Sequence, residues 1–285
     1  KYSVPSAYYD SSLVILKHTP YCLRFLHTSI REDVSAVQTA VRANPLVFKY
    51  AMGETRNTKD IVLLAVSASG RLLIHASDEL REDKEVVLAA VRNSGTALEF
   101  ASETLKSDLE VVFAAVKHDG MALQFVHEDL AKREDVVLPA VQQNGDALGF
   151  ALGKAWDSTH IILAAVAFTP SAWWHASRKA RNDRATALRA VQCQPLTFQF
   201  AREYCDDKEI AIAAVRQEGK LLPFVSDDLI RDRDVALAAF RCSGRFAFSW
   251  FPRGSRTRLP YHFERDKEII SWWNLTRGQC AWRRL

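Results

Sequence analysis

The sequence of 285 residues predicts an all-α solenoid, a right-handed superhelix of short helical hairpins with about 25 residues per repeat. Two observations lead to this prediction. The stretch 83–105, DKEVVLAAVRNSGTALEFASETL, recurs at 108–130 as DLEVVFAAVKHDGMALQFVHEDL, with its charges, apolar residues and glycine in the same order. Each half of this stretch also places apolar residues at the spacing of a helix, which indicates two helices in every repeat.

The first helix of the repeat is expected to begin at Asp83, because an aspartate accepts hydrogen bonds from the free N–H groups of a first turn. Apolar residues from Val86 to Val91 follow at helical spacing. Arg92 lies in the last turn, where a cation meets the negative end of the helix dipole. We expect Gly95 to end this helix by adopting a positive φ.

The second half of the repeat is expected to be another helix. Ala97, Leu98, Ala101 and Leu105 stand at helical spacing, and Phe100 is the one large ring in this half. Helices of about ten residues are too short to be stable alone in water, so they must pack on those of neighbouring repeats.

The repeats align on the position of Val91, which we call the anchor and from which we count positions. The ten anchors are Leu16, Val41, Val66, Val91, Val116, Val141, Val166, Val191, Val215 and Phe240. An alanine precedes nine of these ten anchors, which permits the close approach of adjacent helices. Position +4 is glycine or proline in every repeat, so each turn either ends the first helix with glycine or opens the second with proline.

Position +9 holds a ring in nine repeats, and we expect these rings to fill the core. They are Phe25, Tyr50, His75, Phe100, Phe125, Phe150, His175, Phe200 and Phe224.

Three regions are expected: an N-terminal extension at 1–9, tandem α-helical repeats at 10–250, and a basic, Trp-rich C-terminal arm at 251–285. The arm includes a degenerate eleventh repeat at 266–274, DKEIISWWN, which an insertion of nine residues displaces from the regular step. Terminal repeats need an atypical outer face, so this segment is either a cap or a docking place.

Composition narrows the functional classes. The formal net charge is +4, but the arm alone holds seven Arg and one Lys against three acids, so the repeats are close to neutral. Such a charge distribution does not favour nucleic-acid binding along the whole repeat surface. Five cysteines without a CxxC pair favour an intracellular, reducing compartment, either cytoplasmic or organellar, and no apolar stretch is long enough to predict a membrane span.

Position +1 is cationic in six repeats, which predicts a basic ridge along one edge. Its residues are Lys17, Arg42, Arg92, Lys117, Arg216 and Arg241. The ridge could bind phosphates. The more economical interpretation is that each cation complements the C-terminal end of its own helix, opposite the acidic helix starts.

The seventh repeat and the arm carry the aromatic and basic residues that we expect to bind a partner. Phe168 stands where other repeats have a polar residue, and Trp173 and Trp174 follow the turn. One of these rings should fill the layer, and the others either form an exposed apolar patch or pack a wider layer. The expected partner-binding residues are Phe168, Trp173, Trp174, Trp250, Trp272, Trp273, Trp282, Arg253, Arg256 and Arg258.

The sequence contains no GxSxG, GxGxxG, P-loop or HExxH motif. His75 and His175 lie four repeats apart, too far to share a metal ion, and paired acids recur at helix starts, where capping explains them. We therefore expect no catalytic, cofactor-binding or metal-binding residues and no enzyme.

The unit DKEVVLAAVRNSGTALEFASETL resembles the repeat of a helical family catalogued as domain of unknown function 4116. The resemblance covers about residues 10–250 and is strongest in repeats four to six. It implies an all-helical repeat fold, and it implies no activity, cofactor or site residue.

Two functions are expected from these features. The first is a non-enzymatic helical-repeat scaffold that mediates protein–protein interaction, as a subunit or assembly factor of a larger complex. The alternative is an RNA-binding or other nucleic-acid-binding repeat protein that uses the basic ridge and the C-terminal tail.

Overall fold

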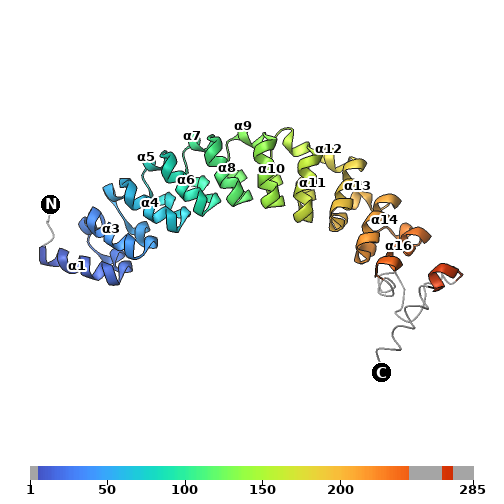
Figure 1. Cartoon of the computed structure of the whole chain (residues 1–285), viewed down its shortest axis with the longest axis horizontal. Helices are drawn as coiled ribbons and strands as arrows, with labels where there is room; N and C mark the ends of the chain where they lie inside the picture. Colours follow the sequence, from blue (N-terminus) through green and yellow to red (C-terminus); the bar gives the residue numbers. More distant parts are fainter. Residues whose placement is uncertain (1–5, 244–264, 272–285) are drawn as a thin grey trace, which may run out of the picture. The chain divides into compact units, whose positions relative to one another are not determined.

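The computed structural model describes residues 6–243 and 265–271, and every regular element in these ranges is a helix (Figure 1). The predicted all-α tandem-repeat fold is confirmed. The contacts divide the chain into two units, residues 1–155 and residues 156–285, and each unit is described by itself.

The first helix of the repeat forms as the sequence predicts. In the fourth repeat this is α6 (Lys84–Asn93), and the carboxylate of Asp83 accepts hydrogen bonds from the backbone N–H groups of Glu85 and Val86. The apolar residues from Val86 to Val91 that face the core are fully buried. The helix ends at Asn93, and the backbone becomes extended at Ser94.

The second half of the repeat is not a single helix, so that prediction is wrong. It consists of the 3₁₀ helix η5 (Gly95–Phe100), an extended link and the one-turn helix α7 (Glu103–Lys106). The link forms because the N–H of Ser102 donates to the carbonyl of Arg81 in the preceding repeat, 3.1 Å away, instead of to its own helix. Corresponding bonds join Ser77 to Arg56 and His127 to Lys106.

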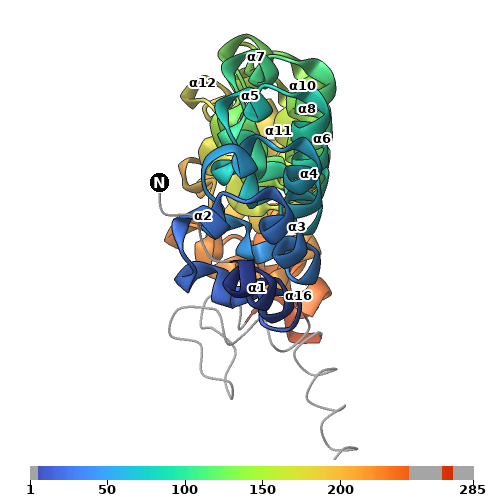
Figure 2. The same cartoon turned by 90° about the vertical axis from the view of Figure 1, so that its left-hand side faces the viewer.

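The same order of elements recurs through both units. Unit 1 contains α1 (Ser6–His18), η1 (Pro20–Phe25), α2 (Thr28–Arg31), α3 (Val34–Ala43), η2 (Pro45–Tyr50), η3 (Gly53–Asn57), α4 (Lys59–Ala68), η4 (Gly70–His75), α5 (Asp78–Arg81), α6, η5, α7, α8 (Leu109–His118), η6 (Gly120–Phe125), α9 (Glu128–Ala131), α10 (Glu134–Gln143) and η7 (Gly145–Phe150). Figure 2 shows α4, α6, α8 and α10 along one side of this unit. The 3₁₀ helices pack on one another beside them.

Unit 2 begins within η8 (Ala155–Asp157). It contains α11 (Thr159–Phe168), η9 (Pro170–His175), α12 (Arg178–Arg181), α13 (Arg184–Cys193), η10 (Pro195–Gln199), η11 (Arg202–Tyr204), α14 (Lys208–Gln217), η12 (Gly219–Phe224), α15 (Asp227–Ile230) and α16 (Arg233–Ser243). Residues 267–271 are also helical.

The large core residue of each repeat is at position +7 and not at position +9. The residues at +7 are Leu23, Phe48, Leu73, Leu98, Leu123, Leu148, Trp173, Phe198 and Leu222, each at most 1% exposed. The rings at +9, including Phe100, are only half-buried or are exposed, and Phe25 is 75% exposed. The prediction of a ring core is therefore wrong. The reason is that a 3₁₀ helix has three residues per turn, so Gly95, Leu98 and Ala101 share the buried side.

The turn glycines serve close packing and not a positive φ. The described glycines with positive φ are Gly53 and Gly153, so the prediction for Gly95 is wrong. A Cβ on Gly95 would lie 2.4 Å from the carbonyl oxygen of Ala115 in the next repeat. The equivalent distance from Gly70 to the oxygen of Ala90 is 2.2 Å. Glycine is required here because the next helix leaves no room for a side chain.

Each close approach is accompanied by a hydrogen bond to position +2 of the next repeat. The N–H of Gly70 donates to Oδ1 of Asn93 at 2.8 Å, and the N–H of Gly95 donates to Nδ1 of His118 at 3.2 Å. Proline has no N–H to donate, and it occupies the first turn of η1, η2, η9 and η10, as the sequence predicts.

Candidate interaction surfaces

The outward side of each 3₁₀ helix is formed by positions +5 and +8. These positions are one turn apart, so their side chains lie one above the other. In η1, η2 and η4 each pair combines one cation with one large apolar residue. The pairs are Tyr21 with Arg24, Leu46 with Lys49, and Ile74 with Arg71, and we call these six residues the N-terminal face.

All six residues of the N-terminal face are exposed. Tyr21, Leu46 and Ile74 are 46%, 45% and 49% exposed. Because η1 packs on η2 and η2 packs on η4, the three pairs lie side by side. Among the described residues, no acid pairs with Arg24, Lys49 or Arg71.

Rings at position +9 adjoin this face and two of them hold its cations. The guanidinium of Arg24 lies 4.3 Å from the ring centre of Phe25, and the ammonium of Lys49 lies 5.0 Å from that of Tyr50. Burial lowers the pKa of His75, and the nearby positive charges of Arg56 and Lys49 lower it further. This side of the first three repeats is therefore both apolar and positively charged.

The next three 3₁₀ helices of unit 1 have a different character. Positions +5 and +8 of η5, η6 and η7 hold Thr96 and Glu99, Met121 and Gln124, and Asp146 and Gly149. These helices contain two acids and no Lys or Arg. The combination of cations with exposed apolar residues thus belongs to η1, η2 and η4.

The aromatic residues of the seventh repeat are divided between core and surface. Trp173 is fully buried at position +7, so it fills the layer and cannot contact a partner, and its inclusion among the predicted partner-binding residues is wrong. Trp174 is 49% exposed and Phe168 is 75% exposed. Phe168 is the last residue of α11, before the turn, whereas Trp174 lies toward the other end of η9.

Two residues that the sequence analysis did not select hold Trp174 in place. The indole N–H of Trp156 donates to the carbonyl of His175, next to Trp174. The Arg181 guanidinium lies 5.6 Å from the Trp174 ring centre, and its Nε donates to the carbonyl of Ala176 at 3.2 Å. A tryptophan within the polar segment GKAWDST is unusual enough to have indicated Trp156 as part of this surface.

The predicted basic ridge is exposed. Its residues in unit 1 are Lys17, Arg42, Arg92 and Lys117, and those in unit 2 are Arg216 and Arg241. Arg241 donates from Nη2 to Glu268 Oε1 at 2.7 Å, whereas the other five form no ion pair with a described residue. Each ridge residue lies in the last turn of a ten- to thirteen-residue helix, where it also complements the helix dipole.

The acidic helix starts do more than cap their own helices. The first residue of a helix is often a cation that reaches the N-cap acid of the next repeat. Lys84 Nζ lies 2.8 Å from Asp108 Oδ2 and 2.9 Å from Glu110 Oε2. Lys59 makes the same contacts with Asp83 and Glu85. These ion pairs form a ladder along one edge of the repeats.

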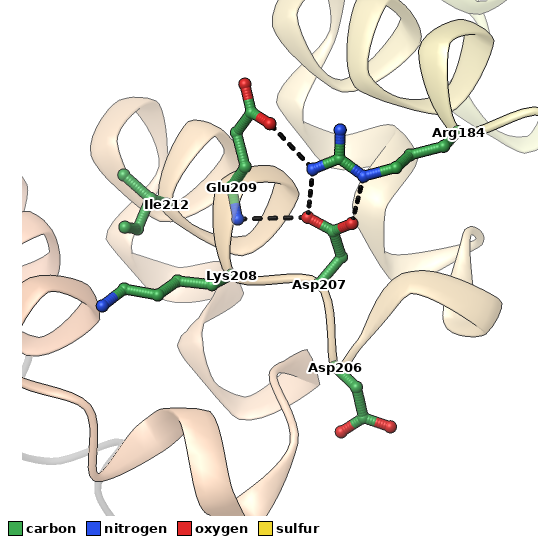
Figure 3. Close-up of a pocket in the computed structure, with 6 residues that line it drawn as sticks. All are labelled: Arg184, Asp206, Asp207, Lys208, Glu209 and Ile212. Atoms are coloured by element: carbon green, nitrogen blue, oxygen red, sulfur yellow. Dashed lines mark hydrogen bonds and ion pairs between the residues drawn. The ribbon is translucent and has the colours of Figure 1, made fainter.

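Figure 3 shows one step of this ladder in unit 2, beside an open depression of about 550 Å³. Arg184 Nε lies 2.6 Å from Asp207 Oδ2, and its Nη2 lies 2.7 Å from Glu209 Oε2. These bonds raise the pKa of Arg184 and lower that of Asp207. Asp206 points away from this pair in the figure. The carboxylates of Asp207 and Glu209 are thus committed to joining repeats.

The ladder continues to residues 265–271. Arg233 Nε lies 2.6 Å from Asp266 Oδ2, and its Nη2 lies 2.7 Å from Glu268 Oε2. Asp266 also accepts hydrogen bonds from the N–H groups of Glu268 and Ile269, as the N-cap of a helix does. Lys208 reaches Asp232 over 24 positions and Arg233 reaches Asp266 over 33, which agrees with an insertion of nine residues.

The predicted partner-binding residues from position 250 onward lie outside the described residues. They are Trp250, Arg253, Arg256, Arg258, Trp272, Trp273 and Trp282.

Three other features bear on function in the described part of the chain: metal-binding groups, cysteine pairs and membrane-spanning helices. Within residues 6–243 and 265–271, no group of three or more His, Cys, Asp or Glu side chains is placed to hold a metal ion. The cysteines at 22, 193, 205 and 242 are free thiols. None of the described helices combines the length and the apolar character needed to cross a membrane.

These features define a tandem helical-repeat protein. The family described as Domain of unknown function (DUF4116) matches three parts of the chain, residues 58–106, 108–152 and 207–253. Three segments of the chain thus match this family in tandem, as the resemblance of the stretch 83–105 predicts. Among curated proteins and solved structures, none matches the chain significantly.

Proposed function

We propose that the chain is a non-enzymatic helical-repeat scaffold that binds another protein, as a subunit or assembly factor of a larger complex. One observation carries this proposal: the outward sides of 3₁₀ helices in both units expose large apolar side chains, although the core position +7 is already filled. Tyr21, Leu46 and Ile74 in unit 1 and Trp174 in unit 2 are each between 45% and 49% exposed. Exposed apolar groups of this kind are typical of protein-binding surfaces.

The charged groups support the same proposal. The carboxylates at the helix starts cap their own helices and bind cations of the preceding repeat, as Asp83, Asp108 and Asp207 do. They are therefore engaged in holding the repeats together. The exposed apolar residues make no comparable contribution to the fold.

The test is affinity purification of the full chain from its source, followed by reconstitution with each purified candidate. The variant Phe168→Ser/Trp174→Ser removes two exposed rings of unit 2, and a deletion of 251–285 removes the arm. The matched control Glu99→Ser/Gln124→Ser changes two exposed polar residues. We expect the wild-type chain and the control to bind a candidate partner directly. The ring variant or the deletion should lose this binding. Equal binding by all variants, with unchanged helical circular dichroism, would exclude the unit 2 rings and the arm as the binding surface, and the absence of any direct binding would contradict the scaffold function.

Nucleic-acid binding is a second candidate function, favoured by the cations of the ridge that pair with no described acid. Lys17, Arg42, Arg92 and Lys117 would bind phosphates without breaking an existing ion pair. The test is a titration with single-stranded RNA at several salt concentrations. Binding that weakens as salt rises and is lost in Arg42→Glu/Arg92→Glu/Lys117→Glu would support this function, and binding that is absent at low salt would exclude it.

A further inference from the structure

The N-terminal face repeats one chemical pattern on three adjacent 3₁₀ helices. Each helix offers a cation and a large apolar side chain one turn apart, and the order is reversed only in η4, where Arg71 precedes Ile74. A 3₁₀ turn rises about 6 Å, so the two groups can contact neighbouring side chains of one bound segment. Such a surface is suited to a ligand in which acidic and apolar groups alternate.

Negative charge is absent from the helices that form this face. The sequences of η1, η2 and η4, PYCLRF, PLVFKY and GRLLIH, contain no acid. Of the acids that follow η4, Asp78 pairs with Arg81 and Glu79 accepts a hydrogen bond from Asn57, and no described acid pairs with a cation of the face. The three cations of the face are thus available to carboxylates from outside.

We propose that the N-terminal face binds an acidic, apolar segment of a partner protein in extended conformation. This inference rests on the proposed scaffold function and specifies the chemistry of its partner. The carboxylates of the segment pair with Arg24, Lys49 and Arg71, and its apolar side chains pack on the apolar residues of the same helices.

The ring contacts favour a protein segment over a nucleic acid. Nucleobases bind by stacking on open ring faces. One face of Phe25 is covered by Arg24, and one face of Tyr50 interacts with Lys49. Leu46 and Ile74 are aliphatic, so they complete a surface for apolar side chains and contribute nothing to stacking or to phosphate binding.

The size of the N-terminal face determines the length of the peptide that tests it. Three layers with helices about 10 Å apart span about 20 Å between the first and the last. About seven extended residues cover that distance, so a peptide of about ten residues is sufficient. The probe is a fluorescein-labelled peptide that alternates Glu or Asp with Leu or Phe. Two comparison peptides replace the apolar residues by Ser or the acids by Lys.

Binding is measured with the full chain by fluorescence anisotropy. We expect the acidic, apolar peptide to bind at least about tenfold more tightly than either comparison peptide. The variant Arg24→Glu/Lys49→Glu/Arg71→Glu should lose this binding, and Leu46→Ser/Ile74→Ser should weaken it. The matched control Arg42→Glu/Arg92→Glu/Lys117→Glu makes the same change in net charge on the ridge and should bind normally.

Three results would overturn the inference: equal binding of all three peptides, undiminished binding by the face variant, or tighter binding of an oligouridine RNA that displaces the peptide. Circular dichroism of every variant shows whether the fold is kept, and the Leu46→Ser/Ile74→Ser variant tests the face without reversing its charge. If a partner is recovered through Trp174 but no peptide binds, only this inference fails. If no partner is recovered in either assay, the scaffold function fails as well.

Discussion

The backbone N–H of Gly95 donates a hydrogen bond to Nδ1 of His118, from one repeat to the next, over 3.2 Å. Gly95 itself is buried, so water cannot readily replace this acceptor. The histidine therefore has a structural role.

Replacing His118 by alanine should reduce the free energy of unfolding by about 1 kcal/mol, because the N–H of Gly95 loses its partner. The variant His118→Asn should retain most of this stability, since Asn93 accepts the equivalent bond from Gly70. Hydrogen exchange at the Gly95 amide is the direct measurement. It should be faster in His118→Ala than in the wild type, and it should not accelerate in His118→Asn. Lys117→Ala, at the exposed neighbouring position, is the control and should leave that amide unchanged.

The substitution Gly95→Ala should destabilise the protein by about 1–3 kcal/mol or more, because its Cβ would meet the oxygen of Ala115 at 2.4 Å. Gly149→Ala is the matched control, since it lies on an exposed 3₁₀ position where other repeats carry Lys49 or Glu99. Urea unfolding followed by circular dichroism compares the two. A Gly95→Ala variant as stable as the control would show that neighbouring repeats can separate without cost.

The parts of the fold that follow local rules could be predicted from the sequence. The N-cap of Asp83 and the buried residues from Val86 to Val91 depend on a few neighbouring residues and on the 3.6-residue period of an α-helix. The second half of the repeat could not be predicted in the same way. Its helix is interrupted by the bond from Ser102 to Arg81, which joins residues 21 positions apart in different repeats.

The candidate surfaces could also be predicted only in part, because the sequence shows local patterns and not the contacts between repeats. The exposed rings of Phe168 and Trp174 follow from their departure from the repeat pattern. The N-terminal face was not predicted, because the sequence pattern placed the +9 rings in the core, whereas the structure buries position +7 and leaves Phe25 and Tyr50 beside the face. A period of three through Gly95, Leu98 and Ala101 is the sequence signal that could have indicated the 3₁₀ helix.

The ion pair between Lys84 and Asp108 should make stability depend on pH in the acid range. The hydrogen bond from Lys84 lowers the pKa of Asp108 in the folded protein below its unfolded value of 3.8. The ion pair therefore contributes fully to stability above about pH 5, and this contribution is lost as the pH falls through the folded pKa of Asp108. The variant Lys84→Met should weaken this dependence, and only slightly, because the pair is partly exposed to water, which screens it.

The measurement is urea unfolding between about pH 2 and pH 6, in the range where carboxylates titrate. Lys117→Met removes a cation that pairs with no described acid, so it should keep the pH dependence of the wild type. An identical dependence in Lys84→Met would mean that the pair does not form in solution. Asp108→Ala should cost more, about 0.5–2 kcal/mol, because it also removes the N-cap.

The buried Trp173 should tolerate replacement by phenylalanine better than its size suggests. Its indole Nε1 is buried and has no hydrogen-bond partner, so losing this N–H carries no penalty. Phe48 and Phe198 occupy the same core position in other repeats. We expect Trp173→Phe to cost about 1 kcal/mol and Trp173→Ala about 3–5 kcal/mol, measured by urea unfolding. Trp174→Ala, at the exposed neighbouring ring, should change stability by no more than about 0.5 kcal/mol. If Trp173→Phe and Trp173→Ala lost the same free energy of unfolding, a smaller ring could not replace the indole. The width of the indole, rather than its burial alone, would then determine the packing of the seventh repeat.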